Sequence, residues 1–135
     1  MRKTSLVFSI WFAVSCGGND VTVDLDKYYA PTVYSSLEYF SISIPVEIAE
    51  KNGKLSFVKL FEKYGFSGNG QAIEQVVRKN IGGNVGEYDS EADAFYINAK
   101  DSSEYTELLT KIKCIEEIAC LNKWLQNATS IIIKE

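Results

Sequence analysis

The chain contains no histidine among its 135 residues, so it lacks the side chain that most often acts as a general base or binds a metal ion. Catalytic arrangements that pair serine or cysteine with histidine are therefore excluded. Proline is also scarce, at 2 residues. With 46% hydrophobic and 24% charged residues, the composition is that of a folded domain, and the length allows one core.

Positive charge is in short supply. The net charge is −4 at pH 7, whereas nucleic-acid-binding domains usually present a basic face. We therefore expect no nucleic acid among the partners of this protein.

A long hydrophobic run is missing as well. The apolar segment 6–14 is about half the ~20 residues that a membrane-spanning helix needs. It follows Arg2 and Lys3 and precedes small residues. This pattern predicts a secretory signal peptide over residues 1–15.

Residues 13–16, AVSC, resemble the lipobox of bacterial lipoproteins, whose cysteine carries the lipid and becomes the new N-terminus. The resemblance implies that Cys16 is lipidated and anchors the protein in the bacterial cell envelope, on the periplasmic side or at the cell surface. A plain secreted protein is the alternative. The Gly-rich, acidic stretch that follows predicts a tether over residues 16–35, before a domain over residues 36–135.

Loss of the signal peptide makes the mature chain more acidic. It removes Arg2 and Lys3, which lowers the number of basic residues from 14 to 12 and leaves all 18 acidic ones. The mature net charge is then 12 − 18 = −6.

Cysteine is limited to three residues, of which Cys114 and Cys120 lie in the predicted domain. In an oxidising compartment such a pair indicates either a disulfide or two small buried side chains. On one straight helix the two would lie about 9 Å apart, too far for a disulfide. A disulfide therefore requires a break in the helix between them.

Hydrophobic periodicity predicts a succession of short strands and amphipathic helices. The order β-α-α-β-β-α-α-β corresponds to a βαββαβ plan with split helices. We therefore predict a single α+β domain, with a mostly antiparallel sheet and helices on one face. The predicted strands are residues 37–44, 84–88, 93–99 and 129–134, and the predicted helices are 55–64, 71–80, 101–112 and 116–125.

Four acidic residues fall within the segment EYDSEADAFYI near the middle of the chain. It lacks the glycine and the final glutamate of a calcium-binding loop, and we expect no metal. Because Phe95 and Ile97 are two apart in a strand, both should face the core, while Asp89, Glu91 and Asp93 stay exposed. These carboxylates form either a solvated turn or part of a protein-binding surface.

The glycines of GFSGNGQ, which begins at Gly65, have the spacing of a phosphate-binding loop. However, glutamine and alanine stand at the positions of its lysine and its serine or threonine. The glycines therefore serve backbone geometry at a helix entry. We expect neither a cofactor nor an enzymatic activity.

Tyrosine is abundant, at 8 residues. Tyr88 and Tyr96 lie in the acidic segment, and Tyr96 should point away from the core. Tyrosine anchors with carboxylates that steer a basic partner are typical of protein-binding surfaces. The alternative is that the tyrosines merely cover the open side of the sheet.

Two segments together, FEKYGFSGNGQAIEQVV and EYDSEADAFYI, resemble the immunity protein 51 family of bacterial polymorphic toxin systems. There, a Gly-Asn-Gly helix entry is followed by an acidic Asp-x-Glu-Ala hairpin turn and an aromatic strand. Residues 68–70, residues 89–92 and Phe95 occupy those places here, and the similarity covers residues 55–112. It implies an α+β domain that binds and neutralises a toxin encoded beside it.

The resulting hypothesis is a lipid-anchored immunity protein that neutralises a cognate protein toxin by stoichiometric binding. The alternative is a surface lipoprotein that binds a ligand or has a structural role without a toxin partner. The candidate partner-binding residues are Asp89, Glu91, Asp93, Tyr88, Tyr96 and Asn69.

Overall fold

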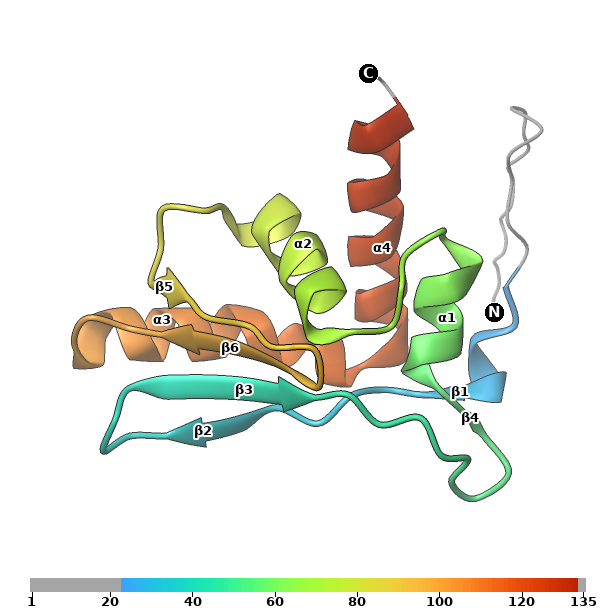
Figure 1. The fold of residues 1–135 in the computed structure, drawn as a ribbon, viewed down its shortest axis with the longest axis horizontal. Coiled ribbons are helices and arrows are strands. Elements are labelled where there is room, and N and C mark those ends of the chain that lie inside the picture. Colours follow the sequence, from blue (N-terminus) through green and yellow to red (C-terminus); the bar gives the residue numbers. More distant parts are fainter. Residues whose placement is uncertain (1–22, 134–135) are drawn as a thin grey trace, which may run out of the picture.

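The computed structural model describes residues 23–133 (Figure 1). The predicted signal peptide over residues 1–15 and the predicted lipidation site, Cys16, lie outside the described residues.

Four strands form an antiparallel sheet in the order β2-β3-β6-β5. A smaller parallel sheet pairs β1 with β4. The strands are β1 (Tyr28–Tyr29), β2 (Tyr34–Ser36), β3 (Ser41–Pro45), β4 (Leu55–Ser56), β5 (Glu87–Tyr88) and β6 (Ala94–Asn98).

The helices cover one face of the larger sheet, which is the face that contributes to the core. In Figure 1, α3 runs behind β6, and α2 and α4 stand close together above the sheet. The helices are α1 (Phe57–Lys63), α2 (Gly70–Ile81), α3 (Ser102–Ile112) and α4 (Ile118–Ile133), with short 3-10 helices η1 (Leu25–Lys27) and η2 (Lys113–Glu116).

The core forms where one face of the larger sheet meets the helices. Ile42 and Ile44 of β3 and Phe95 and Ile97 of β6 are buried in it. The predicted fold class, a single α+β domain with a mostly antiparallel sheet and helices on one face, is confirmed. The helical residues of the core include Leu60, Phe61, Ile73, Val76, Val77, Leu108, Ile112, Leu121 and Leu125.

The predicted final strand, residues 129–134, is wrong, because α4 continues to Ile133. Leu121, Leu125 and Ala128 recur at helical spacing and are buried. Their packing extends the helix through the β-branched residues that follow, against the strand preference of those residues. The chain order therefore closes with a helix instead of the strand of a βαββαβ plan.

The domain begins earlier than predicted, inside the segment assigned to the tether. Tyr28 and Val33 are buried, β1 pairs with β4, and β2 pairs with β3. The Val33 N–H also donates to Glu116 Oε2 at 2.8 Å. Residues 23–35 thus belong to the domain, because Tyr28 and Val33 enter its core and the backbone pairs with later strands.

The strand predicted over residues 37–44 is shorter in the structure. Residues 37–40 form the turn of the β2–β3 hairpin, and Phe40 has a positive φ of 50°. Its ring packs against Tyr105 at a centroid distance of 6.1 Å. Ile42 and Ile44 face the core, as the alternation predicts.

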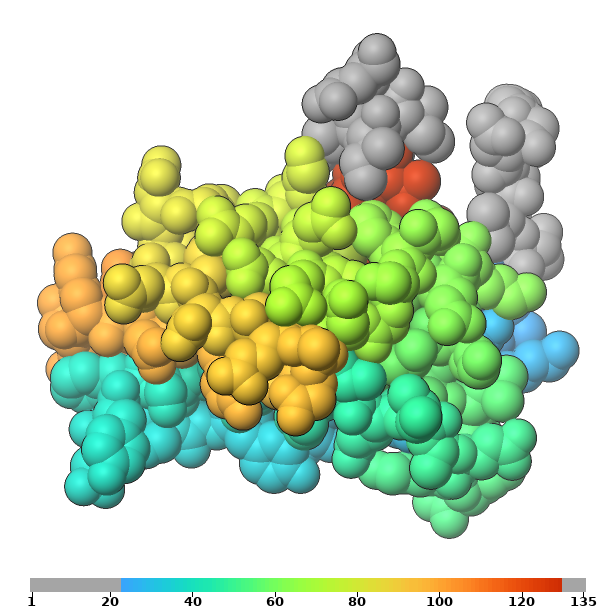
Figure 2. Space-filling view, in the orientation of Figure 1, coloured from blue at the N-terminus to red at the C-terminus, as the bar shows by residue number. Residues whose placement is uncertain are grey.

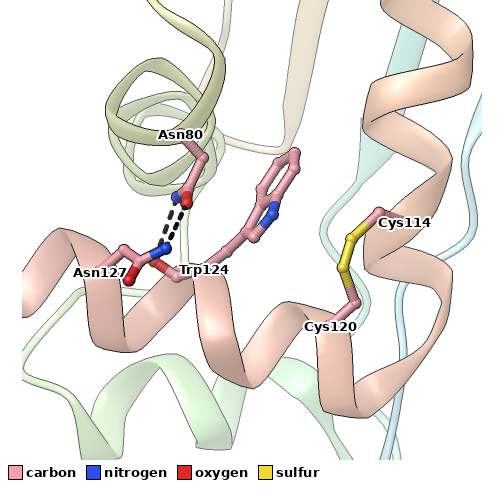
Figure 3. Close-up of a disulfide and its surroundings, with 5 residues drawn as sticks. All are labelled: Asn80, Cys114, Cys120, Trp124 and Asn127. Carbon is pink, nitrogen blue, oxygen red and sulfur yellow. Dashed lines mark hydrogen bonds between the residues drawn. A yellow bond between two sulfur atoms is a disulfide. The ribbon is translucent and has the colours of Figure 1, made fainter.

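The helical run after β6 breaks at Glu117, which has an extended backbone with φ −101° and ψ 124°. The break brings the Cα atoms of Cys114 and Cys120 to 5.8 Å, and the two form a disulfide (Figure 3). Close by, Asn80 links α2 to α4. Its Nδ2 donates to Trp124 O, and its Oδ1 accepts from Asn127 Nδ2, both at 3.1 Å.

Candidate protein-binding face

The β5–β6 hairpin presents the acidic segment at its turn, which lies at the surface in gold in Figure 2. Backbone hydrogen bonds close the turn: Glu91 N–H donates to Ala94 O at 2.8 Å, and Ala94 N–H donates to Glu91 O at 3.3 Å. Asp89, Glu91 and Asp93 are exposed. The predicted exposure of these three carboxylates is confirmed.

The strand that follows alternates as predicted. Phe95 and Ile97 are fully buried, whereas Tyr96 between them is 37% exposed. Tyr96 therefore lies on the opposite face of the sheet from the core.

Asn69 proves to be a helix cap. Its Oδ1 accepts from Ala72 N–H at 2.8 Å, which satisfies one of the free donors in the first turn of α2. The next residue, Gly70, donates its N–H to Ala92 O at 2.9 Å, and a Cβ there would overlap the carbonyl oxygens of Glu91 and Ala94. The helix entry and the acidic turn are thus packed directly together.

Tyr88 also serves the fold. Its register partner is Ile97, so its side chain points to the core side of the sheet. Its hydroxyl donates to Gly82 O at 2.8 Å, and the Arg78 guanidinium lies over its ring, 4.2 Å from the centroid. Burial raises the pKa of Tyr88 to about 12, although the Arg78 charge opposes the shift.

The face opposite the core carries a row of side chains from β2, β3 and β6 and from the residue that follows β5. Tyr34 of β2 pairs with Ser43 of β3, and Ser43 pairs with Tyr96 of β6. One residue beyond the β5 register, Asp89 donates its N–H to Tyr96 O at 3.0 Å. Directly opposed residues share a face, so the row reads Tyr34, Ser43, Tyr96 and Asp89. We name this surface the open face.

The tyrosines of the open face remain accessible, at 54% exposure for Tyr34 and 37% for Tyr96. The neighbouring row, formed by Ser36, Ser41, Asn98 and Glu87, is polar. Sequence reasoning missed Tyr34 and Ser43 as members of one site. The alternation of serine with isoleucine in β3 could have indicated Ser43.

Carboxylates gather along the β5 edge of the open face. Glu87, Asp89 and Glu91 are exposed. Among the ion pairs of residues 23–133, all of which join neighbours three or four positions apart, none involves these three or Asp93. Their charge is therefore free to act on a partner.

A hollow of about 340 Å³ adjoins this edge. Small-molecule sites are usually concave and mostly apolar, whereas this hollow is open and polar. It therefore gives no support to a small ligand as the main partner. Its lining residues are Asn84, Gly86, Glu87, Asn98, Ala99, Lys100 and Glu104.

The described part of the chain holds neither a cluster of potential metal ligands nor a candidate membrane span. Residues 23–133 hold no group of three or more potential metal-ligating side chains. The same residues include no helix with the length and apolar character to cross a bilayer.

The fold and the open face define a single α+β domain with an exposed, tyrosine-bearing and acidic sheet surface. In comparisons with known proteins, no protein-family model, curated protein or solved structure matches the chain.

Proposed function

We propose that this protein is an immunity protein of a bacterial polymorphic toxin system, which neutralises its cognate toxin by stoichiometric binding and not by catalysis. One observation carries the proposal: accessible Tyr34 and Tyr96 share one face of the sheet with carboxylates that form no ion pair within residues 23–133. Tyrosine supplies contact area at the centre of protein interfaces, and free carboxylates accelerate encounter with a basic partner. The resemblance of residues 55–112 to the immunity protein 51 family supports the same function.

The two segments that carry this resemblance have a shared physical role. Gly70 of the helix entry packs on the carbonyl groups of the acidic turn, and its N–H donates to Ala92 O. The Gly-Asn-Gly entry therefore holds the turn in place, and the turn presents the carboxylates. Asn69 and Tyr88 act on binding indirectly, through the fold, while the toxin contacts the open face and the turn.

The test removes the charge and keeps the shape. The variant Asp89→Asn, Glu91→Gln, Asp93→Asn should melt like the native protein, since exposed charges contribute little to folding. It should protect cells less well against the toxin encoded beside its gene, with slower association and weaker salt dependence.

A matched control removes three exposed charges away from the sheet. The variant Asp26→Asn, Glu50→Gln, Glu117→Gln changes η1, the segment between β3 and β4 and the link before α4, and it should protect fully. Equal protection by both variants would show that the acidic turn has no part in binding.

The second part of the proposal is a lipid anchor at Cys16, supported by the lipobox-like sequence of residues 13–16. Cys16→Ser should move the protein from the membrane fraction to the soluble fraction. The measurement is cell fractionation with intact-mass analysis. A variant that stays in the membrane fraction with the mass of the native protein would contradict the anchor.

A further inference from the structure

On the open face, the strand register places Tyr34 and Tyr96 on either side of Ser43, and we call the position between the two tyrosines the slot. Tyr34 and Tyr96 are both direct neighbours of Ser43, so their Cα atoms lie about 10 Å apart, twice the strand spacing of about 4.8 Å. Side chains stand roughly perpendicular to a sheet. The hydroxymethyl group of Ser43 lies between the two tyrosines and is much shorter than their phenol side chains.

The other side of the same hairpin shows which group suits such surroundings. There the Arg78 guanidinium lies 4.2 Å from the Tyr88 ring centroid, and its Nε is 2.9 Å from Glu74 Oε2. Tyrosine, arginine and carboxylate thus form one arrangement on the helix-covered side. The open face has the tyrosines and the carboxylates of this arrangement without the arginine.

The charge of the open face points the same way. Asp89 continues the Tyr34, Ser43, Tyr96 row, and Glu87 follows in the next row. The pairs that build these two rows contain no lysine or arginine. Lys100, which lines the adjoining hollow together with Glu87, lies beyond them. Lys51 is close enough to Tyr34 to interact with it electrostatically, and its charge is paired with Glu47 at 3.0 Å.

We propose that the slot between Tyr34 and Tyr96 receives an arginine side chain from a basic segment of the protein partner, with Asp89, on the other side of Tyr96, as the carboxylate of the same row. A planar guanidinium stacks on aromatic rings and offers hydrogen bonds to carboxylate, whereas lysine is a compact, strongly hydrated charge. The inference rests on the proposed function and specifies what the binding surface recognises.

The experiment uses model peptides and requires no toxin. Oligoarginine, oligolysine of the same length and neutral oligocitrulline are titrated into the isotopically labelled protein and followed by NMR. Oligoarginine should bind about two- to fivefold tighter than oligolysine, and oligocitrulline should not bind measurably. The largest shift changes should fall on the amides of Ser43 and Tyr96.

Two variants test the slot. Tyr34→Leu with Tyr96→Leu should abolish the preference for arginine while the salt-dependent attraction common to both cationic peptides remains. Tyr39→Leu, an exposed tyrosine in the β2–β3 turn, is the matched control and should keep the preference. If the double variant does not fold, Ser43→Arg fills the slot from within and should abolish the preference, with Ser43→Gln as its control.

Equal affinity of the native protein for the two cationic peptides, or no binding of either, would overturn the inference. A preference that survives in a folded slot variant would do the same. These outcomes are separate from toxin protection. If the carboxylate variant loses protection and the native protein shows no preference for arginine, the proposed function stands and the inference about the slot fails. If the protein prefers arginine and the carboxylate variant still protects, the slot stands and the proposed role of the carboxylates fails.

Discussion

Tyr88 and Tyr96 lie on paired strands of one hairpin but on opposite faces of the sheet. The hydroxyl of Tyr88 is bonded to Gly82 O, and its ring is covered by Arg78 and packs edge-on to Phe95. Tyr96 remains 37% exposed, with Asp89 next to it and Tyr34 on the same face, across Ser43. Proximity to an acidic segment in the sequence therefore does not make a tyrosine part of a binding surface. The strand register decides which face it joins.

Truncation of one side chain on each face of β6 tests the difference in burial between the two faces. Phe95→Ala should lower the free energy of unfolding by about 3–5 kcal/mol, because it leaves a cavity in a closely packed core. Tyr96→Ala should change it by less than about 1 kcal/mol, as expected for a surface position. Chemical denaturation measures both. Similar losses of stability for the two variants would mean that the Tyr96 side chain is buried like that of Phe95, which contradicts an exposed open face.

A second substitution tests whether the entry of α2 holds the acidic turn in place. Gly70→Ala should cost about 1–3 kcal/mol in unfolding free energy, because its Cβ meets the backbone carbonyls of Glu91 and Ala94 and must displace the hairpin turn. The control is Gly83→Ala, whose Cβ would meet only the side chain of Arg78 and should cost under about 0.5 kcal/mol. A tolerated Gly70→Ala would show that the turn is not held by α2.

Removal of the Tyr88 hydroxyl, on the core side of the sheet, should lower the stability less than the substitutions above. Tyr88→Phe removes one hydrogen bond and should cost about 0.5–1.5 kcal/mol at neutral pH. The pKa of Tyr88 is raised from 10.0 to about 12 in the folded protein. The neutral phenol therefore stabilises the fold fully below pH 10, and this contribution is lost as pH rises toward 12.

The pH dependence of the unfolding free energy provides a control for the Tyr88→Phe prediction. Denaturation of native protein and Tyr88→Phe is compared from neutral pH to about pH 12. Other titrating groups contribute equally to both, so the native protein alone should show the additional loss of stability from Tyr88. Parallel curves would contradict the raised pKa.

Short-range signals in the sequence were enough to predict the central part of the fold. The helices predicted over residues 71–80 and 101–112 and the two strands predicted around the acidic turn all depend on residues a few positions apart. The exposure of the acidic turn followed from the same alternation. These features need no knowledge of the rest of the chain.

The remaining features depend on distant contacts. Residues 129–133 have strand propensity, but the buried stripe of α4 overrides it. Residues 23–35 are acidic enough to suggest a tether, yet Tyr28 and Val33 enter a core built by later elements. The open face also exists only through register, since Tyr34 and Tyr96 meet across Ser43 from strands far apart in sequence.

The early start of the domain limits how far the protein can reach from its proposed anchor. With Val33 bonded to Glu116 and β1 paired with β4, only residues 16–22 separate a lipid on Cys16 from the described domain. Even fully extended, that segment spans no more than about 25 Å, less than the thickness of a bilayer. Neutralisation would then be confined to a thin layer at the membrane surface, and a toxin would be intercepted only as it crosses that layer.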